Sequence, residues 1–221
     1  MRVSIREFIK ICIETLPLPD PIYEFGSLLV PGQEEMINLR PMFSGREYVG
    51  ADFREGPGVD MILDLHNIRL PDDAAGTVLL IDTIEHVEFV RKAISEVNRI
   101  LKPNGILIMS SHMDFPIHGY PNDYWRFTPS AFESLLSPFA FSFVSALGRK
   151  NFPHTLVGVG FKSVLPEDTM DAFLAIAKTW TKRWRWQIFL NWKECVRRML
   201  PPFLLEWYMD WCMARNKTTN S

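Results

Sequence analysis

Four acidic side chains close short segments of the chain that we predict to be β-strands. Glu24 is followed by Gly26, whose missing side chain lets a backbone approach a ligand closely. Asp52, Asp64 and Asp82 each end a later β-branched or apolar segment. Carboxylates accept hydrogen bonds from hydroxyl and amino groups, and ligands of open parallel sheets bind beyond the carboxyl ends of the strands. The spacing therefore predicts one ligand site where these four side chains meet.

Three histidines stand near the same predicted strand ends. His86 follows Asp82 closely, and His112 and His118 belong to residues 111–128, a polar and aromatic segment after the last predicted parallel strand. An imidazole can take up a proton near neutral pH. We predict that His86, His112 or His118 acts as a general base. A structural role for His86, capping the helix that follows it, is the alternative.

The segment around His86 also permits a metal site. Asp82, Glu85 and His86 are spaced at i, i+3 and i+4, so a helical turn would place them on one face. Two carboxylates and an imidazole suit a divalent cation such as Mg²⁺ or Mn²⁺, which can orient and acidify a hydroxyl group. We do not favour this alternative, and our prediction is a site without metal.

Residues 111–128 stand where a second reactant must enter. Arg126 could clamp a carboxylate or a phosphate on this reactant. The residues that we expect to contact it are Tyr120, Asp123, Tyr124 and Arg126. The alternative for this segment is structural. Trp125 and Phe127 would then fill the core, and Thr128 would cap the next helix ahead of a proline.

Strands and helices alternate along the chain, which indicates a parallel, doubly wound sheet. Residues 77–82 contain an unbroken apolar run, typical of a strand buried on both faces. Residues 86–101 repeat apolar side chains every three or four positions and predict a helix. The other predicted strands are residues 21–27, 47–52, 61–65 and 106–109, with an antiparallel hairpin at 140–147 and 154–164. The expected fold class is α/β: a Rossmann-like, mostly parallel seven-stranded sheet with a C-terminal antiparallel hairpin and helical N- and C-terminal extensions.

The order of these motifs resembles the class I S-adenosylmethionine-dependent methyltransferases. E-x-G follows the first strand, D-L stands at 64–65, D-T-I-E-H-V begins at Asp82, and L-K-P-N-G begins at Leu101. The resemblance covers about residues 20–165 and implies S-adenosylmethionine as cofactor. It implies that Glu24 and Gly26 lie near the methionine part and Asp52 on the ribose. It also implies Asp64 and Leu65 by the adenine and Asp82 beneath the methyl group, with Ser27 as a further cofactor-binding residue. One position departs from the family, which usually has a second glycine where this chain has Leu28.

Two extensions flank the predicted methyltransferase domain, which we place at residues 17–166. Residues 1–16 have the apolar spacing of an amphipathic helix. Residues 167–221 predict a basic and aromatic helical extension with an apolar stripe, which can pack on the domain, pair with a second copy of the chain, or lie in a membrane interface. The stripe consists of Phe173, Ala177, Trp180, Trp184, Ile188, Trp192, Cys195 and Met199.

The overall composition bears on partners and compartment. The net charge of −2 over 221 residues gives no general attraction to nucleic acid, and we expect no such partner. Three widely spaced cysteines without a C-x-x-C pair argue against a disulfide framework and for a reducing compartment. We expect a cytoplasmic protein, since the sequence holds no uncharged apolar run of about 18 residues. Peripheral contact with the inner face of a membrane, or a homodimer, is left open by the C-terminal helix.

The predicted function is S-adenosylmethionine-dependent methyl transfer to an oxygen of a small molecule or of a glycan- or lipid-linked intermediate, with a nitrogen acceptor as the alternative. A second alternative is a non-catalytic Rossmann-like module that scaffolds a complex through its tail, which the leucine at position 28 would favour. A nicotinamide-dependent oxidoreductase is disfavoured because no G-x-G-x-x-G follows the first strand.

Overall fold

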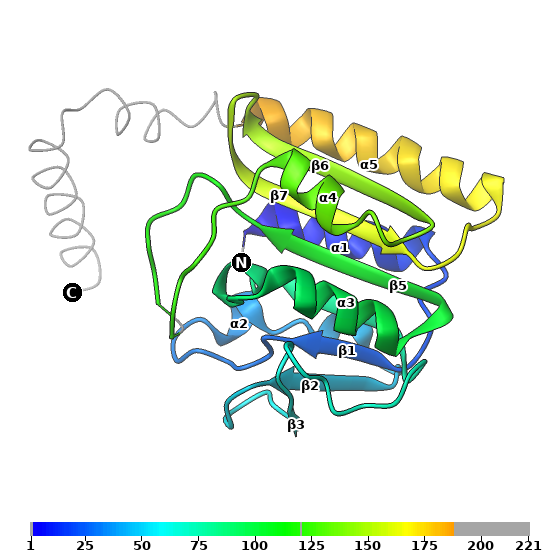
Figure 1. The fold of residues 1–221 in the computed structure, drawn as a ribbon. Helices are drawn as coiled ribbons and strands as arrows, with labels where there is room; N and C mark the ends of the chain where they lie inside the picture. Colours follow the sequence, from blue (N-terminus) through cyan, green and yellow to red (C-terminus); the bar gives the residue numbers. More distant parts are fainter. Residues whose placement is uncertain (1, 120, 188–221) are drawn as a thin grey trace, which may run out of the picture.

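The computed structural model describes residues 2–119 and 121–187, and its centre is a seven-stranded sheet. The strand order is β3-β2-β1-β4-β5-β7-β6 (Figure 1). The strands are β1 (Ile22–Phe25), β2 (Tyr48–Asp52), β3 (Met61–Ile62), β4 (Ala75–Ile81), β5 (Leu101–Ser111), β6 (Phe141–Arg149) and β7 (Phe152–Phe161). β7 runs antiparallel to β5 and to β6, and the other pairs are parallel. This arrangement confirms the predicted fold class, including its C-terminal hairpin.

Helices cover both faces of the sheet (Figure 1). The α-helices are α1 (Val3–Thr15), α2 (Glu34–Ile37), α3 (Val90–Ile100), α4 (Pro129–Leu135) and α5 (Glu167–Gln187), and the 3-10 turns are η1 (Arg40–Phe43) and η2 (Ile84–His86). Side chains of α3 and α4 join one apolar core, and side chains of α1 and α5 join the other. The described parts of both extensions therefore pack on the same sheet as the rest of the chain.

The order of the strands reverses between β1 and β4. β1 pairs in parallel with β2 on one side and with β4 on the other, so that Glu24 lies opposite Gly50 and Leu79. Connections on the two sides of such a point leave the sheet in opposite directions and open a crevice at the carboxyl ends of the strands. Leu79 and Leu80 of β4 are fully buried, as its apolar run predicts.

The helix predicted from His86 begins later, at Val90. Val87 is extended and separates this helix from the turn η2. Asp82 has a φ of +48°, a left-handed conformation, and stands between β4 and η2. Asp82, Glu85 and His86 therefore do not share the helical turn on which the alternative metal site was based.

The third predicted strand is shorter than residues 61–65. Only Met61 and Ile62 pair with β2. Asp64 Oδ1 then accepts a hydrogen bond from the backbone nitrogen of His66 at 2.8 Å, and this local bond turns the chain. After this turn Asp64 is exposed, whereas Leu65 is buried and only 8% exposed.

The described part of the C-terminal apolar stripe belongs to the core. Phe173, Ala177 and Trp180 of α5 are buried in the same cluster as side chains of α1. Nε1 of Trp180 donates to the backbone oxygen of Ser4 at 3.2 Å. Within residues 2–119 and 121–187, none of the helices has both the length and the hydrophobicity that crossing a membrane requires. The remaining predicted members of the stripe lie outside the described residues: Ile188, Trp192, Cys195 and Met199.

Candidate active site

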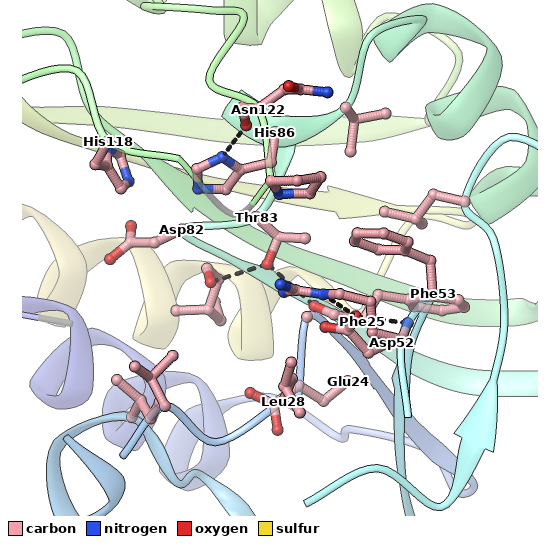
Figure 2. A pocket seen from close by; sticks show the side chains of 18 of the residues that line it. Glu24, Phe25, Leu28, Asp52, Phe53, Asp82, Thr83, His86, His118 and Asn122 are labelled. Carbon is pink, nitrogen blue, oxygen red and sulfur yellow. Dashed lines mark hydrogen bonds and ion pairs between the residues drawn. The ribbon is translucent and has the colours of Figure 1, made fainter. Parts of the chain in front are cut away.

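A cavity of about 620 Å³ opens beyond the carboxyl ends of β1, β2 and β4. Small-molecule sites usually enclose about 300–1,000 Å³. Glu24 and Asp52 lie toward one end of the cavity, which we call the strand end, and His86 and His118 lie toward the other, the histidine end (Figure 2). Thr83 lies between the two ends (Figure 2).

Gly26 is the residue at which the loop after β1 contacts the loop after β4. Its φ is +86°, and a side chain here would place its Cβ 2.4 Å from Oγ1 of Thr83. Thr83 is itself held in place, because its hydroxyl donates to the backbone oxygen of Phe25 at 3.0 Å. Both the backbone conformation and the close contact therefore require glycine at this position.

Leu28, the departure from the family pattern, packs on the loop after β2. A side chain at Gly56 would place its Cβ 2.3 Å from Cδ1 of Leu28. The backbone nitrogen of Leu29 donates to the oxygen of Pro57 at 2.8 Å, which ties the two loops together. The leucine side chain is thus accommodated by a glycine in the neighbouring loop, and the cavity stays open beside it.

Glu24 is a buried carboxyl group at the strand end. It is 7% exposed, and the hydroxyl of Tyr48 donates to it. Burial raises the pKa of Glu24 to about 7, although the hydrogen bond from Tyr48 and the charge of Arg40 act in the opposite direction. A cationic group bound on the cavity side would therefore stabilise the charged form of Glu24.

Asp52 and Asp82 are fixed at the ends of β2 and β4. Asp52 is 5% exposed, and its Oδ1 accepts from the backbone nitrogen of Arg54 at 3.0 Å. Ser110 Oγ donates to Asp82 Oδ1 at 2.7 Å, and the left-handed backbone of Asp82 is of a kind found often at functional sites. Both residues line the cavity.

Six of the seven residues implied to bind the cofactor line this cavity, and Ser27 does not. The hydroxyl of Ser27 donates to the backbone oxygen of Ala51 at 3.2 Å and is buried against Gly50. The side chain of Ser27 therefore fills the space between β1 and β2. The six lining residues are Glu24, Gly26, Asp52, Asp64, Leu65 and Asp82.

Three imidazoles meet at the histidine end. The ring centroids of His86 and His118 are 4.8 Å apart, and those of His112 and His118 are 5.3 Å apart. Nδ1 of His86 lies 2.6 Å from the backbone oxygen of Asn122. A carbonyl oxygen can only accept, so Nδ1 carries the hydrogen and Nε2 carries the lone pair. Burial lowers the pKa of His86, and burial with the nearby charge of Arg126 lowers the pKa of His112 to about 3.

One ion pair holds the loop that carries His118. Asp123 accepts from Arg126 at 2.5 and 2.6 Å, and this interaction keeps the pKa of Asp123 well below its usual range. Asp123 Oδ2 also accepts from the backbone nitrogen of His118 at 2.8 Å. Arg126 donates in addition to the backbone oxygens of Phe115 and Pro116. The pair therefore fixes the loop on both sides of His118.

The residues predicted to contact the acceptor have different positions. Tyr124 lines the cavity. Asp123 and Arg126 are not among the described residues that line it, and their charges are directed to each other and to the loop. Tyr120 lies outside the described residues.

The structural alternative for this segment holds in part. Phe127 is 6% exposed and belongs to the core, and Thr128 Oγ1 accepts from the backbone nitrogen of Ala131 at 3.1 Å to cap α4. The same alternative placed Trp125 in the core, but it is 45% exposed. Its Nε1 donates to the backbone oxygen of Val87, the residue after η2, at 2.9 Å.

Three residues that line the cavity were not predicted as site residues: Arg2, Phe53 and Phe115. Phe53 follows Asp52 directly, so an aromatic side chain next to a strand-end acid was an available signal. Arg2 reaches the cavity from the start of α1. Its guanidinium lies 5.4 Å from the centre of the Phe115 ring, and it donates to Thr155 Oγ1 at 2.6 Å. No local pattern indicates this position, because it depends on how α1 packs.

A family profile described as "Methyltransferase domain" matches residues 44–109, from just before β2 to near the end of β5. The matched segment contains Asp52, Asp64 and Asp82. The chain contains a class I S-adenosylmethionine-dependent methyltransferase domain. The match favours a methyltransferase over the non-catalytic scaffold. No curated protein matches the chain.

The methyltransferase domain shares its fold with solved structures of low sequence identity. The Burkholderia thailandensis 1,6-didemethyltoxoflavin-N1-methyltransferase, solved with S-adenosylhomocysteine, is 16% identical, with a TM-score of 0.55 over 73% of this chain and 79% of its own. An Archaeoglobus fulgidus S-adenosylmethionine-dependent methyltransferase is 14% identical, with a TM-score of 0.55 over 72% of this chain and 93% of its own. A Pyrococcus horikoshii protein is 16% identical, with a TM-score of 0.52 over 73% and 92%.

S-adenosylmethionine is the cofactor of the methyltransferase domain, and the strand end of the cavity fits it. Gly26 leaves a surface without a side chain, which a Cβ would fill. Glu24 offers a buried carboxyl group that can accept from an ammonium group, and Asp52 offers one that can accept from ribose hydroxyls.

The affinity of the domain for S-adenosylhomocysteine is expected to rise with pH through about 7. Below this pH, Glu24 of the ligand-free domain holds a proton, which an ammonium group must displace. The affinity should fall by up to about tenfold per pH unit below the pKa. Calorimetry from about pH 6 to pH 8 measures it.

Two further measurements check the role of Glu24 in this pH dependence. Glu24→Gln has no proton to lose, so its affinity should be independent of pH over this range. The ligand-free domain should lose stability as the pH rises from 4.5 to about 7, because the folded state holds the proton that the unfolded state has released. An unchanged pH dependence in Glu24→Gln would assign the titration to another group.

Proposed function

We propose that the domain methylates a hydroxyl oxygen of a small molecule or of a glycan- or lipid-linked intermediate. The observation that carries this proposal is the cluster of His86, His112 and His118 at one end of the cavity whose other end fits the methyl donor. A hydroxyl must lose its proton when it is methylated, and an imidazole is a suitable base near neutral pH. The residues proposed to bind the cofactor are Glu24, Gly26, Asp52, Asp64, Leu65 and Asp82.

When bound, S-adenosylmethionine supplies a methyl group on a positively charged sulfur, so transfer to a hydroxyl leaves S-adenosylhomocysteine and one proton. We assign this proton to Nε2 of His86, because Nδ1 already carries a hydrogen toward Asn122. The ring centroids of Phe115 and His112 are 4.5 Å apart, and Tyr124 also lines the cavity. We assign these aromatic side chains the role of enclosing the acceptor and excluding water, so that the chain contributes mainly positioning and a proton acceptor.

Methyl transfer to a panel of acceptors tests the proposal. The full chain is incubated with ¹³C-methyl-labelled S-adenosylmethionine and with phenols, quinols or nucleotide sugars, and the ¹³C chemical shift of the product identifies the methylated atom. We expect an oxygen-bound methyl group. His86→Gln should lower kcat by about 10²–10⁴-fold, the usual contribution of a general base.

Binding of S-adenosylhomocysteine is the control for this experiment, because it depends on the strand end of the cavity. His86→Gln should bind it as tightly as the unchanged chain does. A nitrogen-bound methyl group would overturn the assignment to oxygen. A kcat that His86→Gln leaves unchanged would contradict the role of His86 as the base.

A further inference from the structure

Glu85 is a buried carboxyl group behind the histidine end of the cavity. Its side chain is fully buried, and Oε2 accepts from Ser111 Oγ at 2.8 Å. Its Oε1 has no hydrogen-bond partner within residues 2–119 and 121–187. The backbone nitrogens of Tyr124 and Trp125 donate to the backbone oxygen of Glu85, which fixes its position. Leaving a buried carboxyl oxygen without a partner is costly, so an occupant is expected at Oε1.

His112 lies beside this oxygen and is 5% exposed. Its Nε2 has no hydrogen-bond partner in the described part of the chain, and the ring nitrogen close to Glu85 is Nδ1. Its Nδ1 lies 3.4 Å from Glu85 Oε1. A charged hydrogen bond of this kind would measure about 2.7–2.9 Å. Two ligand atoms of a tetrahedral zinc ion, with bonds of about 2.0–2.2 Å, lie about 3.3–3.6 Å apart. The observed separation therefore suits two ligands of one ion better than a hydrogen-bonded pair.

His118 completes the group. Among the residues that the structure describes, Glu85, His112 and His118 each have a ligand atom within 4.8 Å of the other two. Nδ1 of His118 lies 3.0 Å from Asp123 Oδ2 and 3.2 Å from the backbone oxygen of Pro116. Both of these atoms accept, so Nδ1 carries the hydrogen and Nε2 the lone pair. Metal-binding histidines usually donate their second ring nitrogen to a carboxylate or a carbonyl in this way.

We propose that Glu85, His112 and His118 bind a divalent transition metal, with zinc as the preferred ion. Two imidazoles and one carboxylate are a ligand set of zinc and of iron(II), whereas magnesium and calcium prefer oxygen ligands. The ion would also offset the cost of burying the carboxylate of Glu85. Of the three residues that the sequence offered for a metal, only Glu85 belongs to this set.

The role of this metal rests on the proposed function. Three protein ligands leave a fourth zinc position for another ligand. His112 and His118 line the cavity, so we expect that position to face the acceptor. A hydroxyl bound to zinc loses its proton more readily, and Nε2 of His86 would receive that proton. The metal would thus activate the same acceptor oxygen that the methyl group reaches.

Zinc titration tests the site without any acceptor. The full chain is freed of metal with a chelator, and ZnCl₂ is then added in competition with a chromogenic chelator. We expect one tight zinc per chain, and replacement by Co²⁺ should give the visible absorption of a four-coordinate ion. Glu85→Gln and His118→Asn should each weaken zinc binding by at least about 100-fold, since loss of a group that only orients a ligand already costs about 10–100-fold.

His66→Asn is the matched control, because His66 also lines the cavity but pairs with Asp64. It should bind zinc as the unchanged chain does. S-adenosylhomocysteine binding reports folding, and His118→Asn decides the test if Glu85→Gln does not fold. Zinc affinity that His118→Asn leaves unchanged would overturn the site. Zinc binding without methyl transfer to any acceptor would support the site and count against the proposed function. Full methyl transfer by the metal-free chain would overturn the role in acceptor activation.

Discussion

Replacing Trp180 by alanine is expected to lower the free energy of unfolding of the full chain by about 3–5 kcal/mol. Trp180 is 4% exposed, and its ring centre lies 4.9 Å from that of Phe8. The substitution opens a cavity between α5 and α1 and removes the donor to the backbone oxygen of Ser4. Urea unfolding followed by circular dichroism measures the change.

Ile176→Ala is the matched control on the same helix. Ile176 is 45% exposed, so its truncation should change the free energy of unfolding by no more than about 0.5 kcal/mol. An equally small cost for Trp180→Ala would contradict the packing of α5 on α1. It would also return this part of the apolar stripe to the candidates for a membrane or partner surface.

Gly26→Ala is expected to damage both stability and cofactor binding. The left-handed backbone costs a residue with a side chain about 1–2 kcal/mol, and the contact with Thr83 adds about 1–3 kcal/mol of overpacking. Relief of this contact requires Thr83 or the loop after β1 to move, and both form the wall of the cavity. The affinity for S-adenosylhomocysteine should therefore fall by about 10–100-fold, measured by calorimetry.

A double-mutant cycle separates the two causes. In a Thr83→Ala background Oγ1 and Cγ2 are gone and only the Cβ of residue 83, at 3.2 Å, stays near position 26, so Gly26→Ala should cost little more than the backbone term of about 1–2 kcal/mol. The same unfolding and binding measurements apply to all four proteins of the cycle. Equal costs in both backgrounds would show that the contact with Thr83 contributes nothing and that backbone conformation alone requires glycine.

Much of the fold and of the strand end could be predicted, because both depend on local patterns. The apolar run of β4 predicts its complete burial, and acids at the ends of parallel strands must meet at one edge of the sheet. Ser27 shows the limit of this reasoning. It is adjacent to Gly26, but the direction of its side chain depends on the close approach of β2, where a side chain at Gly50 would lie 2.8 Å from Ser27 Oγ.

The histidine end was harder to predict, because distant residues determine it. His112 and His118 were recognised by type, but the position of His118 near Glu85 depends on the ion pair between Asp123 and Arg126 that holds its loop. The helical periodicity around His86 also suggested a continuous helix. The extended backbone of Val87 separates η2 from α3, and neither glycine nor proline marks this break in the sequence.

Leu28 and Gly56 share one small volume between two loops. The contact between the two positions therefore depends on the size of both residues. Position 56 also has a φ of +159°, so a glycine at position 28 would remove the contact but not the backbone strain of a larger residue at 56, whereas a bulky residue at 28 adds a contact that demands glycine at 56. We expect the two positions to covary for this reason. Natural selection then acts on their combined size, and a motif search that counts glycines only in the first loop would pass over chains whose cofactor pocket is intact.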